Sequence, residues 1–385
     1  MPGATARPRV LLLITLAEVG GAQSYVAALL PALAERYDVT LAAYGEGPLR
    51  EAAARSGARF VPLRNVRRPI NPLRDLAGLI ELRRLMRRER PHVVHANSSK
   101  AGVLGRVAAA TTGVPIRFFT VHRWAFSAYS GLASLLYRFA DRTMASLTTV
   151  TICVSERELA DGLQAGTCSA ERSVVIHNAV DLAAAPRSRH DRATPRLIAV
   201  GRLKAPKDFL TLIRALAGLS NQGYEALIVG DGPDRTAVEA EIRRLGVEDR
   251  VQLAGERSDV PELLAASDVF VLSSRSEGLP VSVLEAMAAE LPVVASGVGG
   301  LAELVDDGAT GILVPPGDEP ALAQALERMV EDSELRQRFG AAGRARAESS
   351  FDLSAFQRAH LELYDRQLGL AGAVTEPPVE LAEGR

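Results

Sequence analysis

Two glutamates, Glu277 and Glu285, stand eight positions apart in the segment of this sequence that is best suited to hold a polar ligand. Glu277 follows an apolar strand-like run, Val269–Leu272, and a helix should begin near Pro280 or Ser282, because proline favours the first helical turn. The first amides of a helix are free and its positive end attracts anions, while carboxylates nearby accept hydroxyl groups. The segment therefore predicts a site for a polyhydroxy phosphate ester. The alternative is an ordinary strand–loop–helix connection with two solvated glutamates.

A second loop supplies fixed positive charge. Gly201, Arg202 and Lys207 follow another apolar run, residues 197–200. A guanidinium and an ammonium about one loop apart can stabilise the charge that grows on a departing diphosphate when a glycosidic bond breaks. The alternative is a solvated basic loop, which is the weaker interpretation because ligands in open α/β sheets bind at strand ends.

Four further features follow predicted strands and carry weaker signals. Gly20 and Gly21 could let the backbone approach a ligand at a helix start, although a tight turn would use the same residues. His122 could donate to a sugar hydroxyl or a phosphate, but a lone histidine is more often structural. Arg257 stands where a nucleobase could meet backbone groups. The hydroxyls of residues 97–100 are expected to cap the following helix, and the alternative is that they contact an anion.

Strand-like runs alternate with helical patterns along the whole chain, which predicts an α/β protein with parallel sheets covered by helices on both faces. The runs RVLLLITLAEVGG and RLIAVGRLKAPKD both read strand, glycine loop, helix. We therefore expect two Rossmann-like domains that face a cleft. Residues 1–180 form the first and residues 181–352 the second, the helix 353–368 joins the first, and residues 371–385 are a disordered tail.

Composition limits the class of protein. The chain has 385 residues, 47% of them hydrophobic, and only Cys153 and Cys168 as cysteines, which fits a two-domain globular protein in a reducing cytoplasm. The apolar run at residues 10–17 is too short for a signal peptide, and no run is long enough to span a membrane. We expect a cytoplasmic protein.

The charge is unevenly distributed. Residues 1–180 hold 23 Lys and Arg against 13 Asp and Glu, whereas residues 181–385 hold 22 against 33. The arginine-rich stretch at residues 83–90 could contact anionic lipid at the inner face of a membrane, or it could be a solvated helix face. Nucleic acid is not expected as a partner, because the basic runs lack interleaved aromatics and match no reader motif.

Together these motifs resemble the retaining GT-B glycosyltransferases of family 4, which use nucleotide-activated sugars. The E-x7-E pattern of residues 277–285 carries the resemblance, in company with residues 176–181, 201–207 and 230–233. Three positions differ from the family's usual pattern. Gln23 stands where an acidic residue is common, Arg123 follows the histidine where glycine is frequent, and Ala179 replaces a frequent glycine.

The resemblance implies a role for each candidate residue. Arg202 and Lys207 would bind the donor diphosphate, Glu277 the donor sugar and Glu285 the ribose, with His122 near the transferred sugar. The donor-binding residues that it implies are Gly20, Gly21, Gly201, Arg257, Gly278, Leu279, Pro280, Val281, Ser282, Val283 and Glu285.

The predicted function is retaining transfer of a sugar from a nucleoside-diphosphate sugar to a hydroxyl of a glycan or lipid-linked acceptor, in envelope polysaccharide or lipopolysaccharide synthesis. No cofactor or metal is expected, because the chain has no Asp-x-Asp and two side chains already supply cationic charge. The alternatives are a non-catalytic nucleotide-sugar binder and a glycoside hydrolase that uses Glu277 and Glu285. A nicotinamide oxidoreductase is poorly supported, because neither half carries G-x-G-x-x-G.

Overall fold

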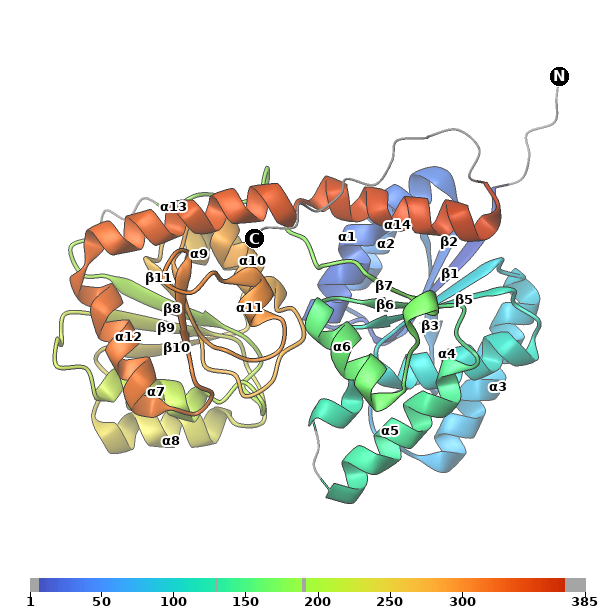
Figure 1. The fold of residues 1–385 in the computed structure, drawn as a ribbon. Helices are drawn as coiled ribbons and strands as arrows, with labels where there is room; N and C mark the ends of the chain where they lie inside the picture. The colour runs from blue at the N-terminus through green and yellow to red at the C-terminus, as the bar shows by residue number, and fades with distance from the viewer. Residues whose placement is uncertain (1–6, 129–130, 189–191, 371–385) are drawn as a thin grey trace.

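A computed structural model describes residues 7–128, 131–188 and 192–370 of the chain (Figure 1). The described residues form two parallel sheets, of seven and six strands, with helices on both faces of each. The predicted α/β class with two Rossmann-like domains is therefore confirmed. The predicted disordered tail at residues 371–385 lies outside the described residues.

The first sheet has the strand order β3-β2-β1-β4-β5-β6-β7. Its strands are β1 (Arg9–Leu16), β2 (Asp38–Tyr44), β3 (Arg59–Leu63), β4 (Val93–Asn97), β5 (Ile116–Val121), β6 (Val150–Cys153) and β7 (Ser173–Val175). Its helices are α1 (Gly21–Arg36), α2 (Pro48–Ser56), α3 (Pro72–Glu89), α4 (Ser99–Thr111), α5 (Gly131–Ala145) and α6 (Glu156–Ala165). The central strands are mostly apolar, as expected for a sheet that helices cover on both faces, and His95 and Asn97 of β4 are buried polar exceptions.

The second sheet has the strand order β10-β9-β8-β11-β12-β13. Its strands are β8 (Arg196–Val200), β9 (Glu225–Val229), β10 (Val251–Gly255), β11 (Val269–Leu272), β12 (Val293–Ser296) and β13 (Gly311–Val314). Its helices are α7 (Phe209–Ala217), α8 (Arg235–Leu245), α9 (Val260–Ala265), α10 (Val281–Ala288), α11 (Leu301–Leu304), α12 (Glu319–Glu331) and α13 (Ser333–Ser350). β8 pairs directly with β11, so the loops that follow these two strands lie side by side.

The last helix, α14 (Leu353–Leu368), leaves the second sheet and packs on α1 of the first (Figure 1). Polar contacts fix it there. Tyr37 donates to Asp365 Oδ1 over 2.6 Å, and the Tyr25 hydroxyl lies 2.6 Å from His360 Nε2. The domain boundary expected at residues 180 and 181 falls between β7 and β8, and it stays a prediction.

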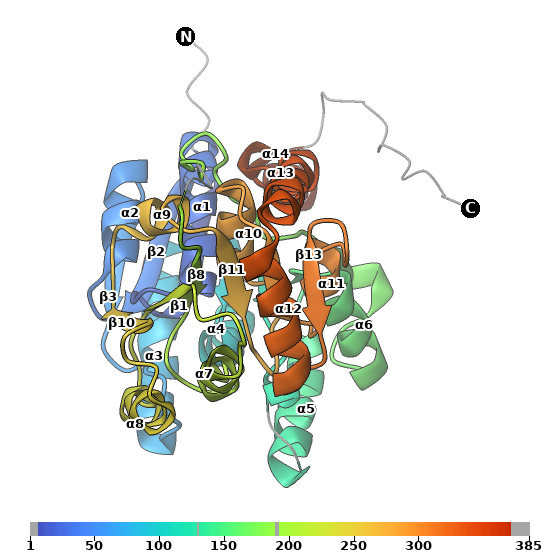
Figure 2. The ribbon, with the colours of Figure 1, turned by 90° about the vertical axis from the view of Figure 1, so that its left-hand side faces the viewer.

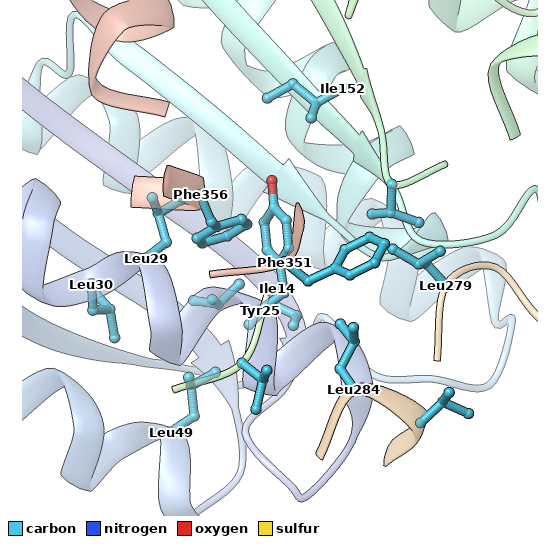
Figure 3. Close-up of a cluster of buried hydrophobic side chains, with 14 of the residues drawn as sticks. Ile14, Tyr25, Leu29, Leu30, Leu49, Ile152, Leu279, Leu284, Phe351 and Phe356 are labelled. Atoms are coloured by element: carbon cyan, nitrogen blue, oxygen red, sulfur yellow. The ribbon is translucent and has the colours of Figure 1, made fainter. Parts of the chain in front are cut away.

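One apolar cluster runs through both halves of the chain (Figure 3). It joins Tyr25 and Leu29 of α1 to Leu279 and Leu284, which come from the loop before α10 and from α10 itself. Phe351, between α13 and α14, packs in the same cluster. The two domains therefore share a buried contact beside the E-x7-E segment.

The expected cap of α4 was wrong in detail. Ser98 occupies the N-cap position but makes no cap hydrogen bond, and its hydroxyl lies 2.7 Å from Thr15 Oγ1. Thr15, at the end of β1, accepts from the Ala101 amide over 3.2 Å and so caps the helix from a neighbouring strand. Across the described residues, no helix combines the length and apolar character needed to cross a bilayer.

Candidate active site

Glu277 and Lys207 form an ion pair where β8 and β11 end. Lys207 Nζ lies 2.8 Å from Glu277 Oε1, and Ser274 donates to the same oxygen over 2.6 Å. Both side chains are mostly shielded from solvent, with exposed fractions of 20% for Lys207 and 12% for Glu277. The pair therefore sits in a partly desolvated position where its charges act more strongly than in water.

The helix after Glu277 begins where the sequence predicts. Pro280 is the N-cap residue of α10, and no side chain caps this end of the helix. Gly278 leads into it at a very close approach to the first domain, because a Cβ added there would lie 1.8 Å from the carbonyl oxygen of His122. Gly299 has φ +58°, and an added Cβ would lie 1.8 Å from the Glu277 carbonyl oxygen. The backbone around the uncapped start of α10 therefore leaves no room for a side chain at either Gly278 or Gly299.

Glu285 lies inside α10, one helical turn from its start, as the sequence predicts. Its carboxylate has no hydrogen bond or ion pair with the described residues. Burial raises its pKa from 4.5 to about 7. A partly buried carboxylate without a partner is available to accept hydrogen bonds from a ligand.

His122 follows β5, and its backbone carbonyl lies beside Gly278 in the loop that precedes α10. Its Nε2 lies 3.2 Å from Asn97 Oδ1, and the Tyr25 ring packs edge-on against the imidazole at 4.9 Å between centroids. Burial lowers the pKa of His122 to about 3. The imidazole is therefore neutral at neutral pH and can form hydrogen bonds without adding charge.

Arg202 reaches from the second domain to the glycine loop of the first. Its Nη1 lies 3.5 Å from Glu18 Oε2, and both side chains are about half exposed. A Cβ added to Gly21 would come within 4.0 Å of Val281 at the start of α10. The loop that contains Gly20 therefore faces both the cationic loop and the free helix end.

Arg257 does not join this group through any contact of the described residues. It forms a two-pronged ion pair with Asp259, with nitrogen–oxygen distances of 2.8 and 2.6 Å, at the exposed end of β10. Its predicted part in nucleotide binding stays a prediction.

Sequence reasoning missed several residues that hold the two domains together at the site. Glu303 of α11 accepts hydrogen bonds from the backbone amides of Glu156 and Arg157, both over 2.9 Å, and from His177 Nε2 over 2.9 Å. It thereby caps α6 of the first domain from the second domain. No local pattern signals this role, because the partners are more than 120 positions away in the sequence.

Two of the three positions that differ from the family pattern make side-chain hydrogen bonds at the site. Gln23 donates to the Leu16 carbonyl over 2.9 Å, which closes the loop after β1. Arg123 donates to the Ser276 carbonyl over 3.1 Å, across the domain boundary and next to Glu277. Both side chains therefore support the backbone of the site.

Comparisons with known proteins identify the family of the chain. The family model described as Glycosyltransferase Family 4 matches residues 19–184, and the model described as Glycosyl transferases group 1 matches residues 184–346. An Escherichia coli UDP-Gal:alpha-D-GlcNAc-diphosphoundecaprenol alpha-1,3-galactosyltransferase is 32% identical over 319 residues, which are 78% of this chain and 82% of the relative. The capsular polysaccharide biosynthesis glycosyltransferase CapM of Staphylococcus aureus is 26% identical, over 76% of this chain and 81% of the relative.

Solved structures share the fold. Anabaena HepE in complex with UDP-glucose superposes with a TM-score of 0.82 at 24% identity, over 93% of this chain and 99% of that one. Sucrose-phosphate synthase from Thermosynechococcus elongatus gives a TM-score of 0.82 at 23% identity, over 94% and 100%. The two family models and the Escherichia coli relative, rather than the shared fold, decide against the binder, hydrolase and oxidoreductase alternatives. The chain belongs to family 4 of the retaining glycosyltransferases, enzymes of the GT-B fold that depend on a nucleotide-sugar donor.

Proposed function

We propose that this glycosyltransferase moves a hexose-type sugar from a uridine diphosphate donor to a hydroxyl group of a lipid-linked glycan, in the synthesis of an envelope polysaccharide or lipopolysaccharide. The observation that carries the proposal is the ion pair of Lys207 with Glu277, set against the uncapped start of α10. The name of the Escherichia coli relative, which states a UDP-linked donor and a diphosphoundecaprenol-linked acceptor, supports the choice of both substrates. The expected cytoplasmic location stays a prediction.

The donor diphosphate would lie between Lys207, Arg202 and the first amides of α10. The helix end contributes partial positive charge and free amides, and the two side chains contribute full charges. Lys207 would turn from Glu277 to the diphosphate when the donor binds. Glu277 is then free to accept hydrogen bonds from the sugar hydroxyls, so one ion pair in the free enzyme prepares both groups.

The ribose would bind at Glu285. Two adjacent ribose hydroxyls can donate to one carboxylate, which supplies the partners that Glu285 lacks. This interaction would help to offset the cost of keeping the carboxylate ionised in a partly buried position.

The chemical step breaks the bond between the sugar C1 and the diphosphate oxygen and forms a bond from C1 to the acceptor oxygen. The acceptor approaches the face that the diphosphate leaves, so the anomeric configuration is retained. The acceptor proton passes to the departing diphosphate oxygen, and Lys207 and Arg202 stabilise the charge on that leaving group. Neutral His122 would accept or donate one hydrogen bond beside the transferred sugar.

A panel of nucleotide sugars tests this function. The purified enzyme is incubated with UDP-, GDP-, dTDP- and ADP-sugars and a polyprenyl-diphosphate-linked sugar, and the products are separated by mass spectrometry. We expect transfer from a UDP-sugar and an α-linked product from an α-linked donor. Transfer from another nucleotide alone would contradict the uridine assignment, and binding or sugar release without transfer would contradict the proposed reaction.

A further inference from the structure

Helix α5 turns its apolar side outward. Its exposed apolar residues have exposed fractions from 59% to 72%, and they are Leu132, Leu135, Leu136 and Phe139. Their spacing of three and four positions places them on one face of the helix. A surface helix of a globular domain normally buries such a face against the core, so here the usual orientation is reversed.

Polar groups and one aromatic side chain hold α5 on the protein. Asp141 is the one buried side chain in the described part of this helix, and it lies 3.8 Å from Arg106 of α4. Arg142 donates through Nε to the Ala165 carbonyl over 2.6 Å. The side of α5 that faces the domain carries these polar groups and Tyr137, which packs against the cluster of Trp124 and Phe126. The three leucines and Phe139 stay exposed on the opposite side.

The start of α3 is exposed in the same way. Four apolar residues here have exposed fractions from 41% to 83%. They are Ile70, two residues before the helix, and Leu73, Leu76 and Ile80 within it. Helix α4 lies between α3 and α5, because Lys100 of α4 pairs with Asp75 of α3 over 2.7 Å and Arg106 of α4 contacts α5. We call these four residues at the start of α3 and the four of α5 together the apolar surface. In both views α5 lies at the end of the molecule opposite α14 (Figures 1 and 2).

Positive charge without partners borders the apolar surface. The acidic side chains of α3 are all engaged, Asp75 with Lys100, Glu81 with backbone amides and Glu89 with Arg59. By contrast, four exposed arginines on and beside α3 make no ion pair with the described residues, and they are Arg68, Arg74, Arg84 and Arg87. Arg83 is different, because its Nε is buried.

We propose that the apolar surface docks on an anionic lipid bilayer. A bilayer offers acyl chains to the leucines and anionic headgroups to the arginines, which is the combination that interfacial helices use. A second copy of this chain fits less well, since a two-fold contact through this face would bring the unpaired arginines of both copies together.

The location suits the proposed acceptor. Helices α3, α4 and α5 all begin at the carboxyl edge of the first sheet, the edge from which His122 extends. A bilayer against these helices would bring a lipid-linked hydroxyl toward this edge. This consequence rests on the proposed function, whereas the membrane contact itself does not.

Vesicle binding tests the contact without substrates. The full chain is sedimented with vesicles of phosphatidylcholine alone and of phosphatidylcholine with 30% phosphatidylglycerol, at low and at high salt. We expect binding to the anionic vesicles only, fading with salt. Leu135→Glu with Phe139→Glu should lower the partition constant at least tenfold, and Arg84→Gln with Arg87→Gln roughly 25-fold, at about fivefold for each arginine.

Matched substitutions control for general effects of sequence change. Leu163→Glu, at a 40% exposed leucine of α6, and Arg243→Gln, at an exposed arginine of α8, should leave vesicle binding unchanged. Thermal unfolding of each variant checks that the fold is kept. Equal binding to neutral and anionic vesicles, no binding at all, or equal loss in the controls would overturn the proposal. So would a dimer in solution that the Leu135→Glu and Phe139→Glu substitutions dissociate, because a second copy would then be the occupant.

Discussion

Donor binding should tighten as pH rises toward 7, and Glu285 should be the group responsible. In the free enzyme burial raises the pKa of this carboxyl to about 7, and ribose hydroxyls would bind its ionised form. Below pH 7 a proton must leave Glu285 before the donor binds. The dissociation constant should therefore rise about tenfold for each unit by which the pH falls. If donor binding restores the ordinary pKa of 4.5, the pKa of Glu285 falls by about 2.5 units, and the binding free energy differs by roughly 3.4 kcal/mol between the two ends of the pH range over which this group titrates.

Isothermal titration calorimetry with a UDP-sugar between pH 5 and 9 measures this dependence. An intact nucleotide sugar has no phosphate group that titrates in this range, and His122 stays neutral throughout because burial lowers its pKa to about 3. Near pH 6, titrations in two buffers of different ionisation enthalpy should show the release of close to one proton. Above pH 8 the dissociation constant should be level.

Two controls isolate the carboxylate. Glu285→Gln should bind the donor more weakly at pH 8 and show no dependence on pH. A 2′-deoxy donor should flatten the profile of the unaltered enzyme, because it removes a hydroxyl that the carboxylate would accept. A dissociation constant that stays level from pH 5 to 8 in the unaltered enzyme would refute the assignment of the ribose to Glu285.

Three further predictions concern the same site. Glu285→Gln should stabilise the fold by about 2–3 kcal/mol at pH 8 and have no effect at pH 4. The protonated carboxyl of Glu285 keeps the full stability below pH 4.5, and this stability is lost as the pH rises through 7 and the buried group ionises. Equal shifts of the urea midpoint at both pH values would contradict this. Lys207→Ala and Arg202→Ala should each cost about 3–4 kcal/mol of transition-state stabilisation, with the exposed Lys204→Ala as control. Turnover within a few-fold of the unaltered enzyme in either variant would remove that residue from the diphosphate site. Glu277→Ala should not weaken the binding of free UDP, because it releases Lys207 from the ion pair, but it should lower turnover or relax sugar choice. A loss of UDP affinity would reassign Glu277 to the nucleotide.

Most of the fold follows from the sequence because the central strands and the amphipathic helices carry strong patterns. The helix predicted at residues 353–368 has the bounds that the structure gives α14, and α10 begins between the two residues expected for its start. The edge strands β3 and β7 escaped notice for physical reasons. β3 is partly exposed and contains Pro62, and β7 has three residues, so neither presents an apolar run.

Helix α5 shows a different limit of sequence reasoning. Residues 132, 135, 136 and 139 carry the spacing of an amphipathic helix, which the sequence alone would have placed against the core. The structure buries Asp141 instead and leaves the leucines exposed. A periodic pattern identifies the apolar face of a helix, but what covers that face depends on the tertiary structure.

The members of the site were predictable, whereas their partners were not. Lys207 and Glu277 were each identified at a strand end, yet their ion pair depends on the direct pairing of β8 with β11, strands separated in sequence by two others. The pKa shift of Glu285 likewise depends on the walls that bury it. Glu303 and its contacts to α6 arise only when the two domains meet.

A crystal structure of the enzyme with an intact UDP-sugar tests the central claim most directly. The distances to follow are those from Lys207 Nζ and from the carboxylates of Glu277 and Glu285 to the ligand. The account predicts that Lys207 leaves Glu277 for the diphosphate, that Glu277 meets the sugar hydroxyls and that Glu285 receives the ribose. A donor bound with its diphosphate away from Lys207 and the start of α10, while the Lys207–Glu277 pair stays intact, would contradict it.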